Sequence, residues 1–468
     1  MHEKNWASQL TALSFGAALL TFIALMPFYS AAAASAHNAA RLAQVPLFLL
    51  ATVFLLVGGR ARWARASTFQ VGLLAVAILL CALHAHQPAA AFRELALCFS
   101  LFFLTLAIHA LQQEIGTEKI LLGIVVSWLI YEAFFLLAWS ASILNNGVGN
   151  FWLMVPGFDN PRFLNHAQTP ALPLLIGVAS DRNNAPRLRR LAWIAATLSI
   201  TILIGLAARA SGVALVLSAL AVAILFRRTG GIYLKRALMA VIAALVFFFC
   251  FFYALPRQLD AAVMTAQHTA SDLVSDHSRL FLWKIALDQL MASPWLGVGP
   301  MHFAEQVNLR GAHPHNIYVQ VLAEYGLPIT LLLLAWLLRL LWRGIRQQQT
   351  ARTTPSVMDV AVIAAVFSLA LDGFLSGNFV MPVSQVWICI ALALFASGSA
   401  AATEYAPAAP QTKPLLQRLV LVALLVFQVA MAYPTVREYE MPRPTLGQRT
   451  PSPESEPNNP RFWLDGWL

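Results

Sequence analysis

The stretch HPHNIYVQVLAEYGLPITLLLLAWLLRLLW, residues 313–342, joins a polar segment with two histidines and one carboxylate to an apolar run. The run at residues 328–342 contains one charged residue, Arg339. Similar runs recur along the chain, and many windows reach the roughly 17 to 25 apolar residues that a helix needs to cross a hydrocarbon core of about 30 Å. This pattern predicts a polytopic helical membrane protein.

The composition agrees with a membrane protein. Of 468 residues, 59% are hydrophobic and 11% are charged, whereas soluble domains carry about 25% charged residues. A soluble multidomain protein is excluded because such runs would leave it no polar surface. The four cysteines lie inside apolar runs without CxxC spacing, which indicates packing residues rather than disulfides or zinc ligands.

We expect an all-α bundle of twelve or thirteen spans, the first of them an uncleaved N-terminal segment. The short span at 169–181 contains Pro170 and Pro173, which favours a broken helix that either lines a cavity or is covered by protein. The candidate spans are residues 8–28, 43–58, 68–84, 93–111, 119–141, 169–181, 190–207, 211–226, 236–254, 328–342, 358–376, 384–398 and 415–433.

Basic residues predict the orientation, because cytoplasmic loops are enriched in Lys and Arg. With a cytoplasmic N-terminus, alternate loops are densely basic, and the opposite loops hold mostly single arginines. This distribution accounts for most of the net charge of +10 without a nucleic-acid partner. The basic loops contain Arg60, Arg62, Arg65, Lys119, Arg182, Arg187, Arg189, Arg190, Arg227, Arg228, Lys235, Arg236, Arg339, Arg343, Arg346 and Arg352.

The spans divide the chain into three parts. N-terminal spans occupy residues 1–145, and a second membrane part occupies residues 146–433. This second part includes the large periplasmic loop 256–327, between spans 9 and 10. A Pro-rich polar tail, residues 434–468, follows on the same side. Another outer stretch runs from about 145 to 169.

Three arginines depart from the positive-inside trend. Arg162 precedes the proline-containing span, Arg209 sits among small residues between two spans, and Arg279 begins a helix in the large loop. Each fits a snorkelling arginine, and each also fits a ligand for an anion, because guanidinium forks bind phosphates well. In the loop helix, the spacing places one apolar face at Leu280, Trp283, Ala286, Leu287 and Leu290.

The two histidines flank Pro314. In an extended segment His313 and His315 point to opposite sides, which argues against one shared metal ion, and a general base is the better interpretation. Asn316 is placed to cap a helix that begins near Ile317. Glu324 either faces inward to orient a basic residue or sits at the membrane interface.

These motifs resemble a known family. An Arg-x-x-x-Trp helix, a Pro-x-x-Gly-x-Gly turn, His-Asn and Glu-x-x-Gly before a span occur here in that order. They resemble the membrane domain shared by O-antigen ligases, O-antigen polymerases and bacterial protein O-oligosaccharyltransferases, over roughly residues 190–395. The expected elements N-terminal to this segment agree with the family in hydropathy only.

The resemblance implies a glycosyltransferase of the bacterial inner membrane that works at the periplasmic face without a metal or other cofactor. It implies a donor glycan on undecaprenyl diphosphate. The family's essential histidine corresponds to His315, and its outer arginines correspond to Arg209 and Arg279. Arg162 is an addition from the residues alone, and His313, Asn316 and Glu324 are supporting residues.

The acceptor stays open at this point. Lipid A–core would make the protein a ligase, Ser or Thr of an exported protein an oligosaccharyltransferase, and a second lipid-linked glycan a polymerase. A ligase is favoured, although the thirteenth span resembles protein transferases. A transporter is the alternative from another class, but no internal repeat is found and the notable polar groups lie in outer loops.

Overall fold

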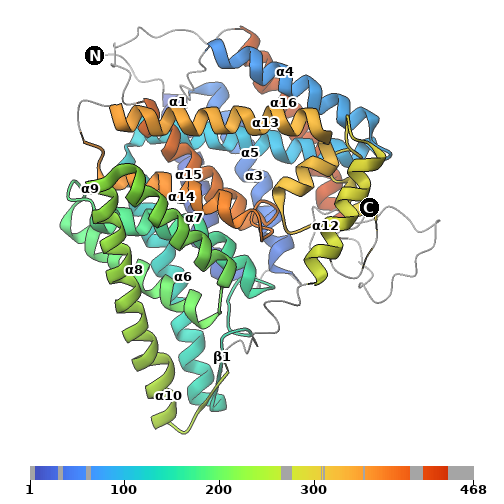
Figure 1. Ribbon diagram of the computed structural model, residues 1–468. Coiled ribbons are helices and arrows are strands. Elements are labelled where there is room, and N and C mark those ends of the chain that lie inside the picture. The colour runs from blue at the N-terminus through green and yellow to red at the C-terminus, as the bar shows by residue number, and fades with distance from the viewer. Residues whose placement is uncertain are drawn as a thin grey trace.

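The structure is a computed structural model that describes residues 6–29, 35–58, 65–264, 277–306, 308, 311–350, 354–400 and 415–440. It is a bundle of helices (Figure 1) with one two-stranded sheet among these residues. Eight of the described helices are long and apolar enough to span a membrane. The prediction of an all-α polytopic membrane protein is confirmed.

The helices follow the expected spans in order. Their bounds are α1 Trp6–Ala24, α3 Ala36–Val57, α4 Arg65–His84, α5 Pro88–Ile115, α6 Thr117–Asn146, α7 Pro161–Ser180, α8 Pro186–Gly205, α9 Arg209–Phe247, α10 Leu255–Gln258, α12 His277–Ala292, α13 Ile317–Thr350, α14 Val357–Asp372, α15 Pro382–Ala400 and α16 Leu415–Glu440. A π-helical stretch, Phe248–Ala254, joins α9 to α10, and short 3-10 turns lie at Met26–Phe28 and His302–Glu305.

Helix α9 contains two of the expected spans. Its backbone leaves helical geometry at Arg227, with φ 42° and ψ −101°. A Cβ on Gly230 would lie 2.2 Å from the carbonyl oxygen of Val222, although residues eight apart in a straight helix are separated by about 12 Å. The chain therefore folds back on itself at 227–230, as a hairpin of two spans. Gly230 allows the close approach.

Contacts between loops sort into two groups. On the expected outer side, strand β1 (Val148–Asn150) pairs in parallel with β2 (Ala262–Met264), and the backbone N–H of Gln87 donates to His302. On the expected inner side, Gln348 donates to Gly398 O and Gln349 donates to Leu225 O. This sorting agrees with the alternation of the spans, while the direction across the membrane rests on the Lys and Arg distribution.

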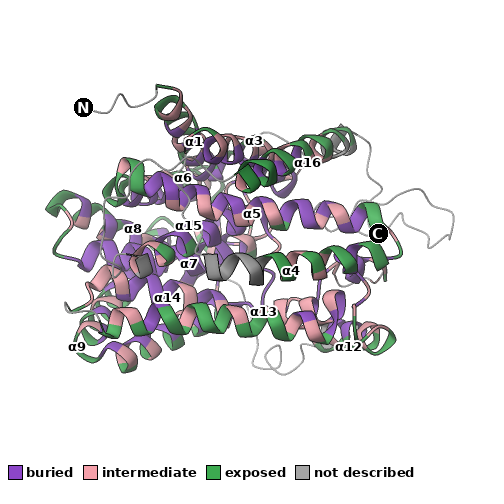
Figure 2. Ribbon diagram, turned by 90° about the horizontal axis from the view of Figure 1, so that it is seen from above, coloured by how far each residue is buried: buried purple, intermediate pink, exposed green. Residues whose placement is uncertain are grey.

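The expected broken span at 169–181 is wrong. Helix α7 runs unbroken from Pro161 to Ser180 with Pro170 and Pro173 inside it. Every residue from Leu164 to Ser180 is buried, and Figure 2 shows α7 among the buried elements of the bundle while α4, α13 and α16 carry exposed faces. The prolines therefore do not break the helix, while its enclosure by neighbouring helices agrees with the expected cover by protein.

Two serines explain how α7 tolerates its prolines. A proline has no N–H, so each one frees the carbonyl four residues earlier. The hydroxyl of Ser384 on α15 donates to His166 O at 3.1 Å, and that of Ser368 on α14 donates to Thr169 O at 3.0 Å. The neighbours thus supply the hydrogen bonds that a membrane interior requires.

Helix α12 is present in the large loop, but its buried face differs from the expected one. Leu282, Ile285 and Ala286 are buried against α13, whereas Leu280 is 61% exposed and Leu287 is 49% exposed. The buried face is rotated about the helix axis from the face that the sequence pattern predicted. The prediction was ambiguous because apolar residues lie on several sides of this helix. Helix α16 continues past residue 433 to Glu440, and residues 441–468 of the expected tail lie outside the described residues.

Candidate functional site

The two histidines lie together, contrary to the expectation that they point apart. Their ring centroids are 4.1 Å apart at an interplanar angle of 61°. His315 has a φ of 53°, a left-handed conformation that breaks the extended geometry on which the expectation relied. The backbone N–H of His315 donates to Nδ1 of His313 at 3.2 Å.

This hydrogen bond gives the rings different roles. Nδ1 of His313 accepts this hydrogen bond, so the neutral ring carries its hydrogen on Nε2, whereas a protonated ring would lose the bond. His313 is 8% exposed, while the His315 residue is half-buried. His313 is thus suited to hold the loop, and His315 is the more accessible of the two histidines.

Three contacts hold this loop in place. Trp283 on α12 donates from Nε1 to Pro314 O at 3.0 Å. The Asn316 side chain accepts from the N–H groups of Tyr318 and Val319, at 3.0 and 3.1 Å, which confirms the predicted helix cap. The N–H of Ile317 donates to Gly373 O at the end of α14, at 2.9 Å.

Glu324 faces inward, at 1% exposure, and Oε1 accepts from the N–H of Phe303 at 3.2 Å. Around it, the Gly-x-Gly turn and the helix are packed backbone to backbone. A Cβ on Gly297 would lie 2.3 Å from the Glu324 carbonyl carbon, and a Cβ on Gly326 would lie 2.5 Å from Trp295 O. Both glycines have φ near 70°, which only glycine adopts readily. Glu324 therefore joins the turn to α13, the helix that follows the two histidines.

The three arginines lie at the starts of three helices. Arg162 is the second residue of α7 and Arg209 the first of α9, and both are exposed. Arg279 lies one turn before Trp283 on α12, so it shares the face that contacts the histidine loop. All three helix starts belong to segments that the charge distribution assigns to the outer side.

A residue that the sequence analysis missed, Asp372, connects these elements. It is 1% exposed at the end of α14. Its Oδ2 accepts from Ser376 Oγ at 2.9 Å and from Thr169 Oγ1 on α7 at 3.3 Å, and its Oδ1 accepts from Ser211 Oγ on α9 at 3.4 Å. His166 Nδ1 lies 3.8 Å from Oδ2. A carboxylate at the end of an apolar span was the signal available in the sequence.

The ends of α7, α9, α13 and α14 that carry or adjoin the candidate residues therefore meet at Asp372 and Gly373, on the expected outer side. We call this meeting point the outer corner. Asp372 binds α7 at Thr169, seven residues after Arg162, and binds α9 at Ser211, two residues after Arg209. The next residue, Gly373, binds α13 two residues after His315. Arg279 lies one turn before Trp283 on α12, and Trp283 donates a hydrogen bond to Pro314 O in the histidine loop. Among the described residues, no group of three His, Cys, Asp or Glu side chains is placed to hold a metal ion.

A comparison with protein families identifies the domain. Residues 194–334 match the family model of the O-antigen ligase, which confirms the resemblance for this segment, although the match ends earlier than the 395 that the motifs indicated. Arg209, Arg279, His315 and Glu324 lie within it. No curated protein matches the chain. The membrane protein thus carries a domain of the O-antigen ligase type.

Proposed function

We propose that this protein transfers a glycan from undecaprenyl diphosphate to an acceptor hydroxyl at the periplasmic face of the inner membrane, as an O-antigen ligase does. The observation that supports the proposal is the outer corner, where the elements that carry the half-buried His315 and the three arginines are joined through Asp372 and Gly373. The family match over residues 194–334 supports the reaction class. The periplasmic placement rests on the charge distribution of the loops.

In the proposed reaction, the acceptor oxygen attacks the anomeric carbon of the donor sugar. His315 accepts the hydroxyl proton as the new C–O bond forms. The bond between the anomeric carbon and the diphosphate oxygen breaks, and its electron pair leaves with undecaprenyl diphosphate. Direct displacement inverts the configuration at this carbon.

The arginines stabilise the leaving group. Negative charge grows on the diphosphate as the bond breaks, and fixed cations that are aimed at it lower the barrier. Arg209 and Arg279 are the proposed ligands, with Arg162 as a third. Asp372 positions the starts of α7 and α9, because its two oxygens bind both helices.

The proposal is tested by replacing His315 with alanine in cells that lack the native gene. We expect loss of glycan transfer with normal insertion into the membrane, and we expect His313→Ala to be milder. Normal transfer by His315→Ala would refute the assignment of the base. Equal binding of lipid-linked donor by wild type and by Arg209→Ala/Arg279→Ala would refute the role of the arginines.

A protein acceptor is the second candidate. The observation that favours it is α16, the additional C-terminal helix at Leu415–Glu440, since protein transferases of the superfamily resemble this chain in having an extra span. The surface chemistry of a deletion strain separates the candidates. Unligated lipid A–core supports a ligase, an unglycosylated exported protein supports a protein transferase, and a glycan of single repeats supports a polymerase.

A further inference from the structure

Helix α12 carries a second apolar face, opposite the one that packs against α13. Leu280, Leu287 and Met291 are 61%, 49% and 78% exposed. Their spacings of seven and four residues place them in one row along the helix. Trp295, 73% exposed, follows just beyond the end of the helix. We call these four residues the α12 stripe.

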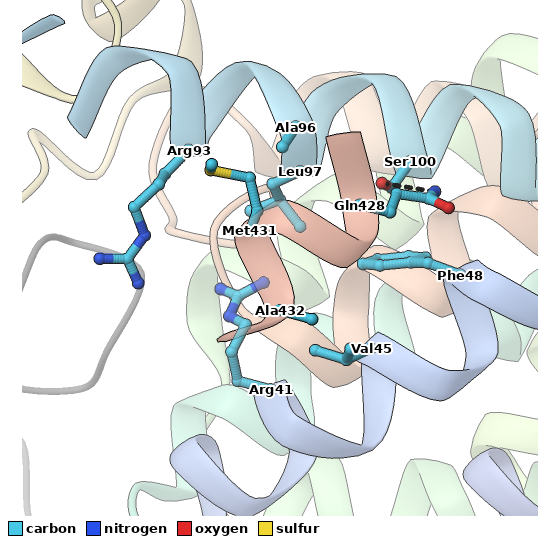
Figure 3. Close-up of a pocket in the computed structure, with 10 residues that line it drawn as sticks. All are labelled: Arg41, Val45, Phe48, Arg93, Ala96, Leu97, Ser100, Gln428, Met431 and Ala432. Atoms are coloured by element: carbon cyan, nitrogen blue, oxygen red, sulfur yellow. Dashed lines mark hydrogen bonds between the residues drawn. The ribbon is translucent and has the colours of Figure 1, made fainter. Parts of the chain in front are cut away.

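Apolar side chains in other parts of the bundle are covered by neighbouring helices. In the pocket between α3, α5 and α16, Figure 3 shows Phe48, Leu97 and Met431 approaching one another from the three helices. Phe48 and Leu97 are buried there. No helix among the described residues encloses the α12 stripe in this way. Its apolar surface is therefore available to a partner.

The end of the stripe lies beside the start of the α13 span. Helix α13 leaves helical geometry at Gly326, with φ 73° and ψ 172°, and the apolar run of the span follows. The backbone N–H of Leu327 donates to Pro294 O at 2.9 Å, and a Cβ on Gly326 would lie 2.5 Å from Trp295 O. These contacts place Trp295 at the expected outer boundary of the membrane.

Helix α12 crosses the end of α13 instead of continuing along it. Figure 1 shows α12 at a steep angle to α13, and Figure 2 places it at the same end of α13. A helix that continued along the span would carry Leu280 about 22 Å beyond Trp295. The crosswise direction instead keeps the whole stripe near the level at which the span begins.

The residue types of α12 match a helix that lies at a membrane surface. Such helices have an apolar face bordered by charged residues, and Trp is enriched at the headgroup level. Lys284 and Asp288 are exposed and lie along one flank of the stripe. The apolar row also continues into the span, where Leu327 is 46% exposed. Hydrocarbon suits the row, while the charged flank requires water or headgroups.

We propose that the α12 stripe inserts into the membrane leaflet on the expected outer side, with the helix lying in the plane of the bilayer. Trp295 and Lys284 then lie at the headgroup level. Trp283 of the same helix donates to Pro314 O in the histidine loop, so the bilayer holds that loop at the height of the headgroups. This interaction with the membrane surface goes beyond the transfer reaction and does not depend on it.

Spin labels test the proposal in the full-length protein, in nanodiscs of phosphatidylethanolamine and phosphatidylglycerol. Cys98→Ala and Cys250→Ala remove the two exposed native thiols among the described cysteines. One label is attached at Met291→Cys, on the stripe, and the control label at Asp288→Cys, on the charged flank. Collision rates with oxygen, which dissolves in hydrocarbon, and with a water-soluble nickel chelate give the depth of each label.

We expect the Met291→Cys label to lie about 5–10 Å below the headgroup level, the depth of an interfacial apolar face. The Asp288→Cys label should lie in water or among the headgroups. Leu280→Asp/Leu287→Asp removes two members of the stripe and should move the Met291→Cys label towards water. Lys284→Gln is the matched control and should leave its depth unchanged. All four positions are exposed, so these changes spare the packing of the bundle.

Four results would overturn the membrane assignment. Equal access of the nickel chelate to both labels would place the stripe in water. Shielding of the Met291→Cys label from both reagents would show that protein covers it, and magnetic coupling between labels would identify a second copy of the chain. An unchanged depth in Leu280→Asp/Leu287→Asp would exclude the stripe as the cause. The measurement uses no donor or acceptor, so its failure is separate from a failure of the transfer reaction.

Discussion

Gly377→Ala should disable the proposed base by moving its neighbour. Gly377 lies in the loop after α14, and a Cβ there would be 2.5 Å from Cε1 and 3.0 Å from Nε2 of His313. Ordinary contact begins at 3.4 Å, so the His313 ring must shift by at least about 0.9 Å. That ring contacts the His315 ring at 4.1 Å between centroids, and the displacement is passed on to His315.

A misplacement of about 1 Å in a catalytic group costs roughly 100-fold in rate. We expect Gly377→Ala to lower glycan transfer by about that factor. The free energy of unfolding should fall by at most about 1–3 kcal/mol, the usual cost of overpacking. The φ of Gly377 lies outside the left-handed region, so the alanine backbone itself is allowed.

The assay is transfer by purified protein from a lipid-linked donor, with thermal unfolding in detergent measured in parallel. Gly231→Ala is the matched control, because no atom lies within 4 Å of its added Cβ on α9 and the residue is exposed on the expected inner side, away from the proposed site. The double variant Gly377→Ala/His313→Ala removes the displaced ring and should recover the activity of His313→Ala alone. Full transfer by Gly377→Ala, or no recovery in the double variant, would refute the proposed coupling between the two rings.

Three further changes test the supports of the corner. Glu324→Leu leaves the buried N–H of Phe303 without its acceptor and should lower the free energy of unfolding by about 1–3 kcal/mol. Glu324→Gln keeps an acceptor oxygen and should retain most of the wild-type stability. Equal unfolding midpoints for both variants would contradict this. Asp372→Ala should reduce transfer more than Asp372→Asn, since the amide still accepts one bond, and the reverse order in a transfer assay would contradict its positioning role. Ser384→Ala should cost about 1 kcal/mol in detergent unfolding by exposing the His166 carbonyl inside the bundle, and no change would show that another donor replaces the serine.

Local chemistry explains why the spans and the helix cap were predictable. Apolar runs of spanning length have few alternatives in a bilayer, because backbone groups there must be bonded within a helix. Asn316 caps α13 through contacts with residues two and three positions later. Such short-range geometry is encoded within a few residues.

The face of α12 and the path of α7 were not predictable in the same way. Helix α12 is apolar on several sides, so its buried face depends on where α13 lies. Helix α7 contains two prolines that predict a break, and only serines from α14 and α15 restore the missing bonds. Both outcomes depend on helices far away in the sequence.

The sequence by itself therefore determined the fold class, the succession of spans and the identity of His315, Arg209 and Arg279 as candidates, because hydropathy, charge and motif order are properties of one chain segment at a time. Only the tertiary structure brought the two histidine rings into contact and showed Asp372 joining α7 and α9. A single left-handed residue, at φ 53°, and hydrogen bonds between distant helices made that difference. Such contacts depend on packing in three dimensions, which the order of residues does not display.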